Sequence, residues 1–271
     1  MLILLPPSET KRGGGAGSPL ALDRLRFPSL NAVRREVVDA VVTLAADRDA
    51  AVRALKLGPK QAGEVDRNRA IPSSPTMRAL ERYTGVLYDA LDAGSLSEAD
   101  WSVAAESVAV QSALLGLVGG ADPVPAYRLS FDSRLSLVRG AHSLKKRWAA
   151  AGADALAERD DLLLDLRSEG YAALAPLPDR PGAHYVRVLA RDADGHVRAL
   201  NHFNKQAKGL LTRALVEAGA GFGSTDELLA WAAAEGYELR PVRDPASRDL
   251  ELVVPEVRGE PGRLMAALRA R

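Results

Sequence analysis

The chain has 271 residues, of which 47% are hydrophobic and 26% are charged, and its formal net charge is +1. This composition is typical of a soluble globular protein with a sizeable core, and the small net charge indicates no class of partner. The sequence contains no cysteine and four histidines. It therefore excludes disulfides, thiolate catalysis and cysteine-ligated zinc, and it argues against a histidine-rich metal site.

The N-terminal residues do not resemble a targeting signal. Met1 to Pro7 has no basic residue before its apolar run, as a signal peptide would have. No uninterrupted apolar run approaches the ~20 residues that are needed to span a bilayer. We therefore expect a cytoplasmic protein that does not enter a membrane.

Leu2 to Leu5 predicts a fully buried strand at the centre of a sheet. The segment after it, Pro6 to Gly15, is rich in glycine, but its spacing fits neither a phosphate loop nor a dinucleotide-binding loop. A surface loop is therefore the favoured interpretation. Ser8, Glu9 and Lys11 nevertheless follow the strand at its carboxyl end, where open α/β sheets present site residues.

Apolar periodicity and capping residues predict helices between the strands. Their expected ranges are Ser29 (as cap) to Ala46, Arg48 to Leu57, Ser74 to Leu91 with Gly85 inside the helix, a short helix or turn from Ser97, Asn204 to before Gly219, and Thr225 (as cap) to Gly236.

Strands and hairpins are predicted from period-two apolar runs and turn residues. Their expected ranges are Ser107 to Gln111, Leu162 to Leu166, a hairpin from Tyr185 to Leu200 that turns at Asp192–Gly195, and a terminal hairpin from Tyr237 to Val254. Without repeats or a long linker, we expect one α+β domain over residues 1–255, a mixed sheet with flanking helices. Residues 256–271 are expected to form a basic, poorly ordered tail.

The stretch from Ser107 to Phe131 predicts a ligand-facing surface. Beyond its strand and an apolar segment, Gly119-Gly120 permits a turn, and a proline-containing connector leads to Tyr127 and Arg128. An arginine beside a tight turn holds either an anion or a buried carboxylate, and Asp165 or Glu169 is the internal candidate. Tyr127 fits a core aromatic residue better than a base-stacking one.

Positive charge gathers in two later stretches. Tyr127 to Ala150 has six basic residues and one acid, and His196 to Val216 has four basic residues and no acid. Lys145, Lys146 and Arg147 fit a solvated helix face as well as a binding surface. Lys205 and Lys208 lie three residues apart on one expected helix face, which favours a site there.

Six separated blocks of the sequence carry a family resemblance: Met1–Thr10, Gly85–Leu91, Ser112–Leu129, Asp165–Tyr171, Lys205–Gly209 and Trp231–Tyr237. In this order they resemble the blocks of the YaaA peroxide-stress family, from Met1 to about Pro255. Departures indicate a divergent branch: Glu9 occupies a lysine position, Gln206 replaces an arginine, and Ala126 interrupts a P-Y-R-L block. Lys11 is a candidate substitute for the lysine that Glu9 replaces.

The resemblance implies a protein that limits oxidative damage and binds DNA through a basic cleft with a helix-hairpin-helix element. Leu115 to Gly120 is the candidate hairpin. Such an element grips phosphates through backbone N–H groups, so recognition follows DNA structure rather than base sequence. The candidate DNA-binding or anion-binding residues are Ser8, Lys11, Tyr127, Arg128, Lys145, Lys146, Arg147, Lys205 and Lys208.

Three classes of function remain open at this stage. The favoured one is a DNA-binding stress protein that does not itself react with peroxide, because the chain has no cysteine and no evident cofactor ligands. The second is an enzyme for a nucleotide-like or other anionic small molecule, in a pocket lined by Ser8, Arg128 and Lys205. The third, an interaction protein that affects iron, lacks a ligand cluster. We expect no cofactor and no metal, and Ser8, Arg128 and Lys205 should line one concavity.

Overall fold

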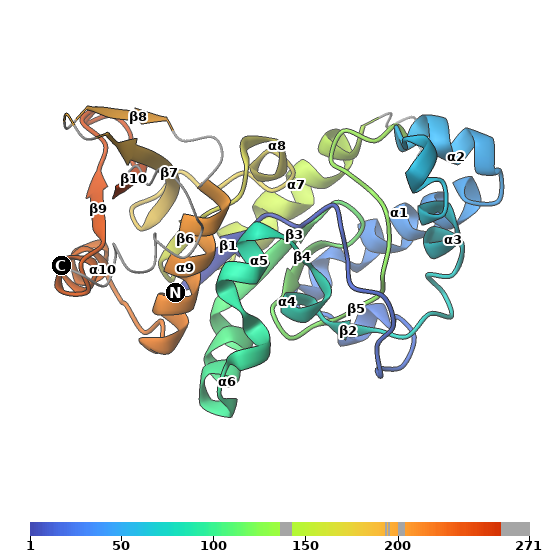
Figure 1. The fold of residues 1–271 in the computed structure, drawn as a ribbon, viewed down its shortest axis with the longest axis horizontal. Helices are drawn as coiled ribbons and strands as arrows, with labels where there is room; N and C mark the ends of the chain where they lie inside the picture. The colour runs from blue at the N-terminus through green and yellow to red at the C-terminus, as the bar shows by residue number, and fades with distance from the viewer. Residues whose placement is uncertain (136–142, 193, 195, 200–203, 256–271) are drawn as a thin grey trace.

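The computed structural model describes residues 1–135, 143–192, 194, 196–199 and 204–255. A mixed sheet of eight strands runs through the molecule, and helices flank it (Figure 1). The predicted α+β class with a mixed sheet and flanking helices is confirmed. The tail predicted for residues 256–271 lies outside the described residues.

The strands follow the order β4-β3-β1-β6-β7-β10-β9 across the sheet, and β8 pairs with β7. Their bounds are β1 Leu2–Leu5, β3 Val108–Ser112, β4 Gly116–Gly119, β6 Leu163–Asp165, β7 Ala183–Arg191, β8 Val197–Ala199, β9 Glu238–Pro241 and β10 Leu250–Pro255. Strands β1, β3, β6, β7 and β10 are mutually parallel, whereas β4, β8 and β9 are antiparallel to their neighbours. The short strands β2 (Met77–Arg78) and β5 (Pro123–Val124) form a separate antiparallel pair.

Strand β1 lies inside the sheet, as its sequence predicts. Its four residues are fully buried. Ile3 pairs with Val108 on β3, and Leu2 pairs with Leu163 on β6. A parallel strand with layers on both faces has no solvated side, which explains why Leu2–Leu5 is continuously apolar rather than alternating.

The helices are α1 Asn31–Leu44, α2 Arg48–Ala54, α3 Glu64–Arg69, α4 Ala79–Arg82, α5 Val86–Leu91, α6 Glu98–Ser107, α7 Leu144–Ala157, α8 Glu169–Ala172, α9 Asn204–Glu217 and α10 Thr225–Ala234. Helices α1, α2 and α3 lie together on the right in Figure 1, and near the middle α9 packs against both α5 and α6. Within the described part of the chain, no helix has both the length and the apolar character to cross a bilayer.

The single helix predicted from Ser74 to Leu91 is wrong. That segment contains β2, α4 and α5, and Gly85 interrupts the helices with a φ of 93°. Its backbone is held by long-range contacts, since Lys11 forms an isolated bridge with Tyr83 and the amide of Thr84 donates to the carbonyl of Thr10. Lys11 and Thr10 are more than seventy residues away in the sequence. The apolar spacing within Ser74 to Leu91 does not contain these contacts, so it predicted one continuous helix.

Two predicted helix caps move by one or two residues. Ser29 lies in a 3-10 turn, Pro28–Leu30, and α1 begins after it. Ser224 rather than Thr225 caps α10, because its hydroxyl accepts from the amide of Glu227. Ser97 caps α6 as predicted, accepting from the amide of Asp100.

The predicted helix-hairpin-helix element is wrong for Leu115 to Gly120. This segment includes β4 and the turn before it, pairs antiparallel with β3, and is buried throughout. The buried Arg34 donates through Nε to the Leu115 carbonyl at 2.8 Å. Because β4 is inside the molecule and its backbone is paired with β3, it cannot present N–H groups to a phosphate backbone.

Both predicted β-hairpins are confirmed. Strand β7 pairs antiparallel with β8, and β9 pairs antiparallel with β10. The predicted buried strand at Leu162–Leu166 is also present as β6, and it lies beside β1. These elements bring the carboxyl ends of β3, β1 and β6 next to one another.

Candidate functional site

The carboxyl ends of three adjacent parallel strands supply the central residues of the candidate site. Ser8 and Lys11 follow β1, Ser112 ends β3, and Asp165 ends β6. The chain connects β1 to β3 on one side and returns later to β6 on the other side. Ligands of open α/β sheets bind at such a reversal of strand order, outside the carboxyl ends of the strands.

The loop after β1 is joined to the segment that precedes α5. The hydroxyl groups of Thr10 and Thr84 lie 2.9 Å apart, and those of Ser8 and Thr10 lie 3.3 Å apart. A Cβ at Gly85 would lie 3.6 Å from Ser8 Oγ, at ordinary van der Waals contact. The predicted surface loop is therefore anchored by contacts distant in sequence.

Lys11 points into the protein beneath this loop. Its Nζ donates to the Ser8 carbonyl at 2.9 Å and lies 4.0 Å from the centroid of the Tyr127 ring. Only 5% of Lys11 is exposed. Burial lowers the pKa of Lys11 to about 7, while Glu9 acts in the opposite direction and Arg128 reinforces the decrease. This amine can thus exchange a proton near neutral pH.

A buried chain of hydroxyl groups lies next to Lys11. Ser112 Oγ accepts from the amides of Leu114 and Leu115, so its own proton is available for the Tyr127 hydroxyl 2.7 Å away. Tyr127 in turn lies 2.9 Å from the hydroxyl of Tyr83. Burial raises the pKa of Tyr83 to about 12, so the chain stays protonated. Tyr127 is fully buried, which confirms its interpretation as a core aromatic residue.

Arg128 lies at the outer side of the same loop. One of its guanidinium nitrogens pairs with a carboxylate oxygen of Glu9 at 2.7 Å and donates to the Glu9 carbonyl at 3.2 Å. Asn68 fixes the backbone of Arg128, accepting from its amide at 2.7 Å and donating to its carbonyl at 2.8 Å. The prediction that Asp165 or Glu169 is the internal partner of Arg128 is wrong, because Glu9 has that role.

Asp165 pairs instead with Arg167, a residue that sequence reasoning missed. Arg167 Nε and one terminal nitrogen bind the two carboxylate oxygens of Asp165 at 2.8 and 2.6 Å. The other terminal nitrogen donates to Gln111 at 3.0 Å. Both charged side chains are almost completely buried. An arginine two residues after a predicted buried carboxylate was the sequence signal that could have revealed this pair.

Lys208 joins this network from α9. Its Nζ donates to the Arg167 carbonyl at 3.3 Å and lies 5.8 Å from the Tyr185 ring centroid. Burial lowers the pKa of Lys208 to about 8, and Asp165 opposes the decrease. Lys208 is therefore an internal cation, whereas Lys205, one turn earlier, is exposed.

The structure brings together Ser8, Lys11, Tyr127 and Arg128 around one loop. Lys208 reaches the same carboxyl edge through Arg167 and Gln111. No contact among the described residues joins Lys205 to Ser8 or Arg128, so their shared concavity stays a prediction.

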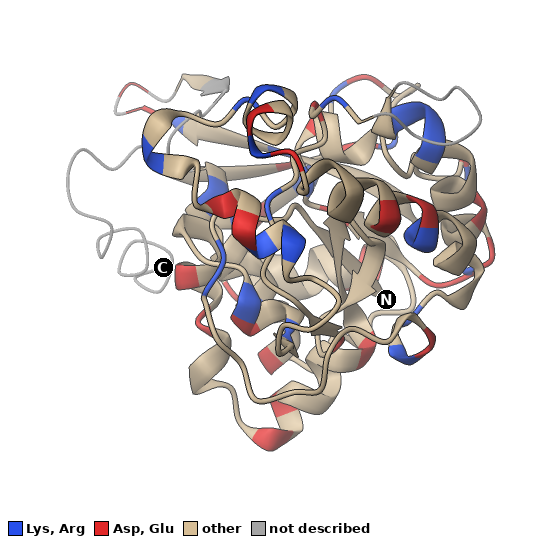
Figure 2. Cartoon of the chain, turned by 90° about the vertical axis from the view of Figure 1, so that its right-hand side faces the viewer, with Lys and Arg blue, Asp and Glu red and all other residues tan. Residues whose placement is uncertain are grey.

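The basic residues of α7 belong to another part of the fold. Lys145 and Lys146 are exposed on the first turn, while Arg147 pairs with Glu36 of α1 at 2.6 Å. Figure 2 shows Lys and Arg interspersed with Asp and Glu over the face that it presents. The predicted basic cleft therefore remains a proposal.

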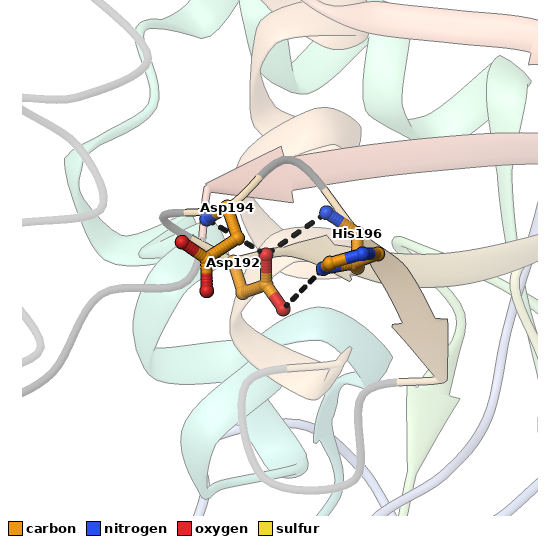
Figure 3. A group of neighbouring side chains, drawn as sticks. All are labelled: Asp192, Asp194 and His196. Carbon is orange, nitrogen blue, oxygen red and sulfur yellow. Dashed lines mark hydrogen bonds and ion pairs between the residues drawn. The ribbon is translucent and has the colours of Figure 1, made fainter.

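A group of metal-ligand residue types occurs in the β7–β8 turn, at Asp192, Asp194 and His196. Figure 3 shows the Asp192 carboxylate accepting from the amides of Asp194 and His196, at 3.0 and 2.9 Å. The His196 imidazole is 81% exposed. These hydrogen bonds stabilise the turn between β7 and β8, which explains why the three residues lie together.

Comparison with known proteins adds the family. Residues 1–243 match the family described as Peroxide stress protein YaaA. The chain belongs to this family. It is 43% identical over 216 residues to a UPF0246 protein of Corynebacterium glutamicum, covering 79% of this chain and 84% of that protein. It is 37% identical over 263 residues to a UPF0246 protein of Streptomyces coelicolor, covering 95% and 100%. The family resemblance predicted from the separated sequence blocks is confirmed.

Proposed function

We propose that this YaaA family member limits damage under peroxide stress by acting on an anionic small molecule at the carboxyl edge of its sheet. The buried amine of Lys11 beside Arg128 is the observation that carries this proposal. A pKa of about 7 lets Lys11 accept or release a proton at neutral pH. Perturbed groups of this kind gather at functional sites.

Each charged residue of the loop has a separate role in this proposal. Arg128 holds the anion, because a guanidinium matches the geometry of a phosphate or carboxylate. In the structure the Arg128 guanidinium is paired with the carboxylate of Glu9, whose side chain is 45% exposed. An incoming anion displaces the Glu9 carboxylate and thereby reaches the edge of the sheet above Lys11. Lys205, which is on α9, is still proposed to line the same concavity as Ser8 and Arg128.

The test is binding of ribose 5-phosphate, a small anion, measured by isothermal titration calorimetry at low ionic strength. Replacing Arg128 with Ala removes a charge-assisted contact and is expected to weaken binding about tenfold or more. Arg134→Ala is the matched control, because it removes an exposed arginine six residues along the chain. Equal affinity in the two variants would exclude Arg128 from the site.

The same variants connect the site with peroxide stress. In cells without the native gene, the wild-type protein and Arg134→Ala should restore survival in hydrogen peroxide, whereas Arg128→Ala should not. Folding of each variant is checked by thermal unfolding. Full protection by a folded Arg128→Ala protein would separate the stress function from this site.

DNA binding is the second candidate function, and the exposure of Lys145 and Lys146 favours it. Exposed lysines can neutralise phosphates and release counterions, which gives binding a steep dependence on salt. Lys11 and Lys208 are buried at 5% exposure each, so they are unsuited to duplex phosphates. Lys205 is the remaining exposed candidate on α9.

Replacing Lys145 and Lys146 together with Ala should lower the slope of log affinity against log salt by about two units. Fluorescence anisotropy with a labelled DNA duplex measures this slope. The double variant Arg48→Ala/Lys60→Ala removes the same charge from other exposed positions and is the control. An equal slope change in both double variants would indicate non-specific attraction instead of a binding surface on α7.

A further inference from the structure

The two large hydrophobic side chains that are exposed in the described part of the chain lie near the same loop. Val86 is 52% exposed and Phe131 is 40% exposed. Val86 follows Gly85, whose backbone approaches Ser8, and Phe131 lies three residues beyond Arg128. Single exposed apolar side chains are common on proteins, but their coincidence with a polar cluster is typical of a ligand site.

Phe131 is held in a fixed position although it is exposed. Its ring contacts that of Tyr171 edge to face, with centroids 5.2 Å apart and planes at 66°. Gly170 provides the space for this ring, since a Cβ at Gly170 would lie 2.6 Å from it. An aromatic ring that is fixed by its neighbours and open to solvent can stack a planar ligand without a large loss of conformational freedom.

Arg128 of the proposed anion site precedes this ring by three residues along the chain. Burial raises the pKa of Tyr171, and the negative charge of Glu9 adds to the increase. Glu9 also pairs with Arg128 at 2.7 Å. Phe131 lies three residues beyond Arg128, so an aromatic ring and a guanidinium belong to one short segment of the chain.

Polar residues border Phe131 along the chain, which argues against a broad apolar docking surface. Asp132 pairs with Lys56 at 2.6 Å, and Arg134 is exposed. A protein or membrane partner needs a contiguous apolar patch. One ring beside one guanidinium instead suits a small ligand with a planar aromatic part and an anionic part.

We propose that the site takes a nucleoside phosphate, with its base stacked on Phe131 and its phosphate held by Arg128. This inference rests on the proposed anion site and adds the base as the second recognised group. Stacking on an aromatic side chain tolerates different bases, because every base has a π face. Phe131 therefore determines that a base is present without selecting its identity.

Calorimetry with AMP and with ribose 5-phosphate, which has no base, tests this assignment. Phe131→Ala should weaken AMP binding about tenfold or more and change ribose 5-phosphate binding less than about twofold. Phe131→Trp, which keeps an aromatic surface, should retain AMP binding. Arg128→Ala should weaken both ligands.

The outcomes separate this inference from the proposed function. Unchanged AMP affinity in Phe131→Ala, together with loss of both ligands in Arg128→Ala, would overturn base stacking and leave the anion site intact. Failure of the wild-type protein to bind either ligand would overturn both proposals.

A further arm compares dTMP with a short single strand of thymidylate, because the end of a DNA strand offers the same chemistry. Equal dependence of both ligands on Phe131 would support the stacking role for a free nucleotide and a strand end alike. Dependence of neither ligand on Phe131 would contradict it.

Discussion

Replacing Asp165 with Ala is expected to lower the free energy of unfolding by about 3–5 kcal/mol. The substitution leaves Arg167 as a buried charge without its carboxylate, and both side chains are almost fully shielded from solvent. Urea unfolding followed by circular dichroism measures the loss. Replacing both partners, in Asp165→Ala/Arg167→Met, should recover part of it because no unpaired charge remains.

The Lys56–Asp132 pair supplies a matched control. Its N–O distance is 2.6 Å, like that of the Arg167–Asp165 pair, but its side chains are 53% and 46% exposed. Solvent screens such a pair, so Asp132→Ala should cost less than about 1 kcal/mol. If Asp165→Ala and Asp132→Ala lowered the free energy of unfolding by similar amounts, burial would not determine how much each ion pair contributes to stability.

Replacing Lys11 with Met should change the pH dependence of stability by several kcal/mol. The pKa of Lys11 falls from 10.5 to about 7 on folding, so the unfolded chain binds more protons between these values. Stability from this group therefore rises with pH across that window, by at most on the order of 5 kcal/mol. Below pH 7 the full cost of burying the ammonium is present.

Urea unfolding at pH 6 and pH 9.5 measures this effect. The free energy of unfolding of Lys11→Met minus that of the wild type should be larger at pH 6 than at pH 9.5. The wild type carries the cost of burying the Lys11 ammonium at pH 6, and this cost disappears as pH rises. Lys205→Met, which replaces an exposed lysine by the same residue, is the matched control. A constant difference for Lys11→Met would contradict a depressed pKa.

Local pattern predicted the strands that build the carboxyl edge. The continuous apolar runs at Leu2–Leu5 and Leu162–Leu166 indicated buried strands, and the structure places β1 and β6 side by side. Pattern also identified Ser8, Lys11, Tyr127 and Arg128 as candidates, and these residues meet around one loop. For Ser8 and Lys11 the physical reason is that parallel strands carry their carboxyl-terminal residues to one edge, whereas Tyr127 and Arg128 follow β5, which lies outside that sheet.

Contacts between distant residues were not predictable in the same way. Glu9 and Arg128 are partners only because the loop after β1 crosses the segment after β5, and no local spacing encodes that crossing. The burial of individual lysines could not be predicted from the sequence either. Lys208 has the sequence neighbours of a surface lysine, yet it is only 5% exposed. The wrong helix-hairpin-helix prediction has a similar origin, because glycines at 116, 119 and 120 fit a β-hairpin as well as a phosphate-gripping turn.

The position of β1 has a consequence for how the chain folds during synthesis. Its partners, Val108 and Leu163, are on the order of a hundred residues or more away along the chain. The ribosome therefore releases Leu2–Leu5 well before either neighbour exists. Until β3 and β6 emerge, these four apolar residues have no strands to pair with. They form an exposed, aggregation-prone segment that nascent-chain chaperones can bind. We expect the native sheet to form late and slowly, because β1 has to wait for partners that are synthesised much later.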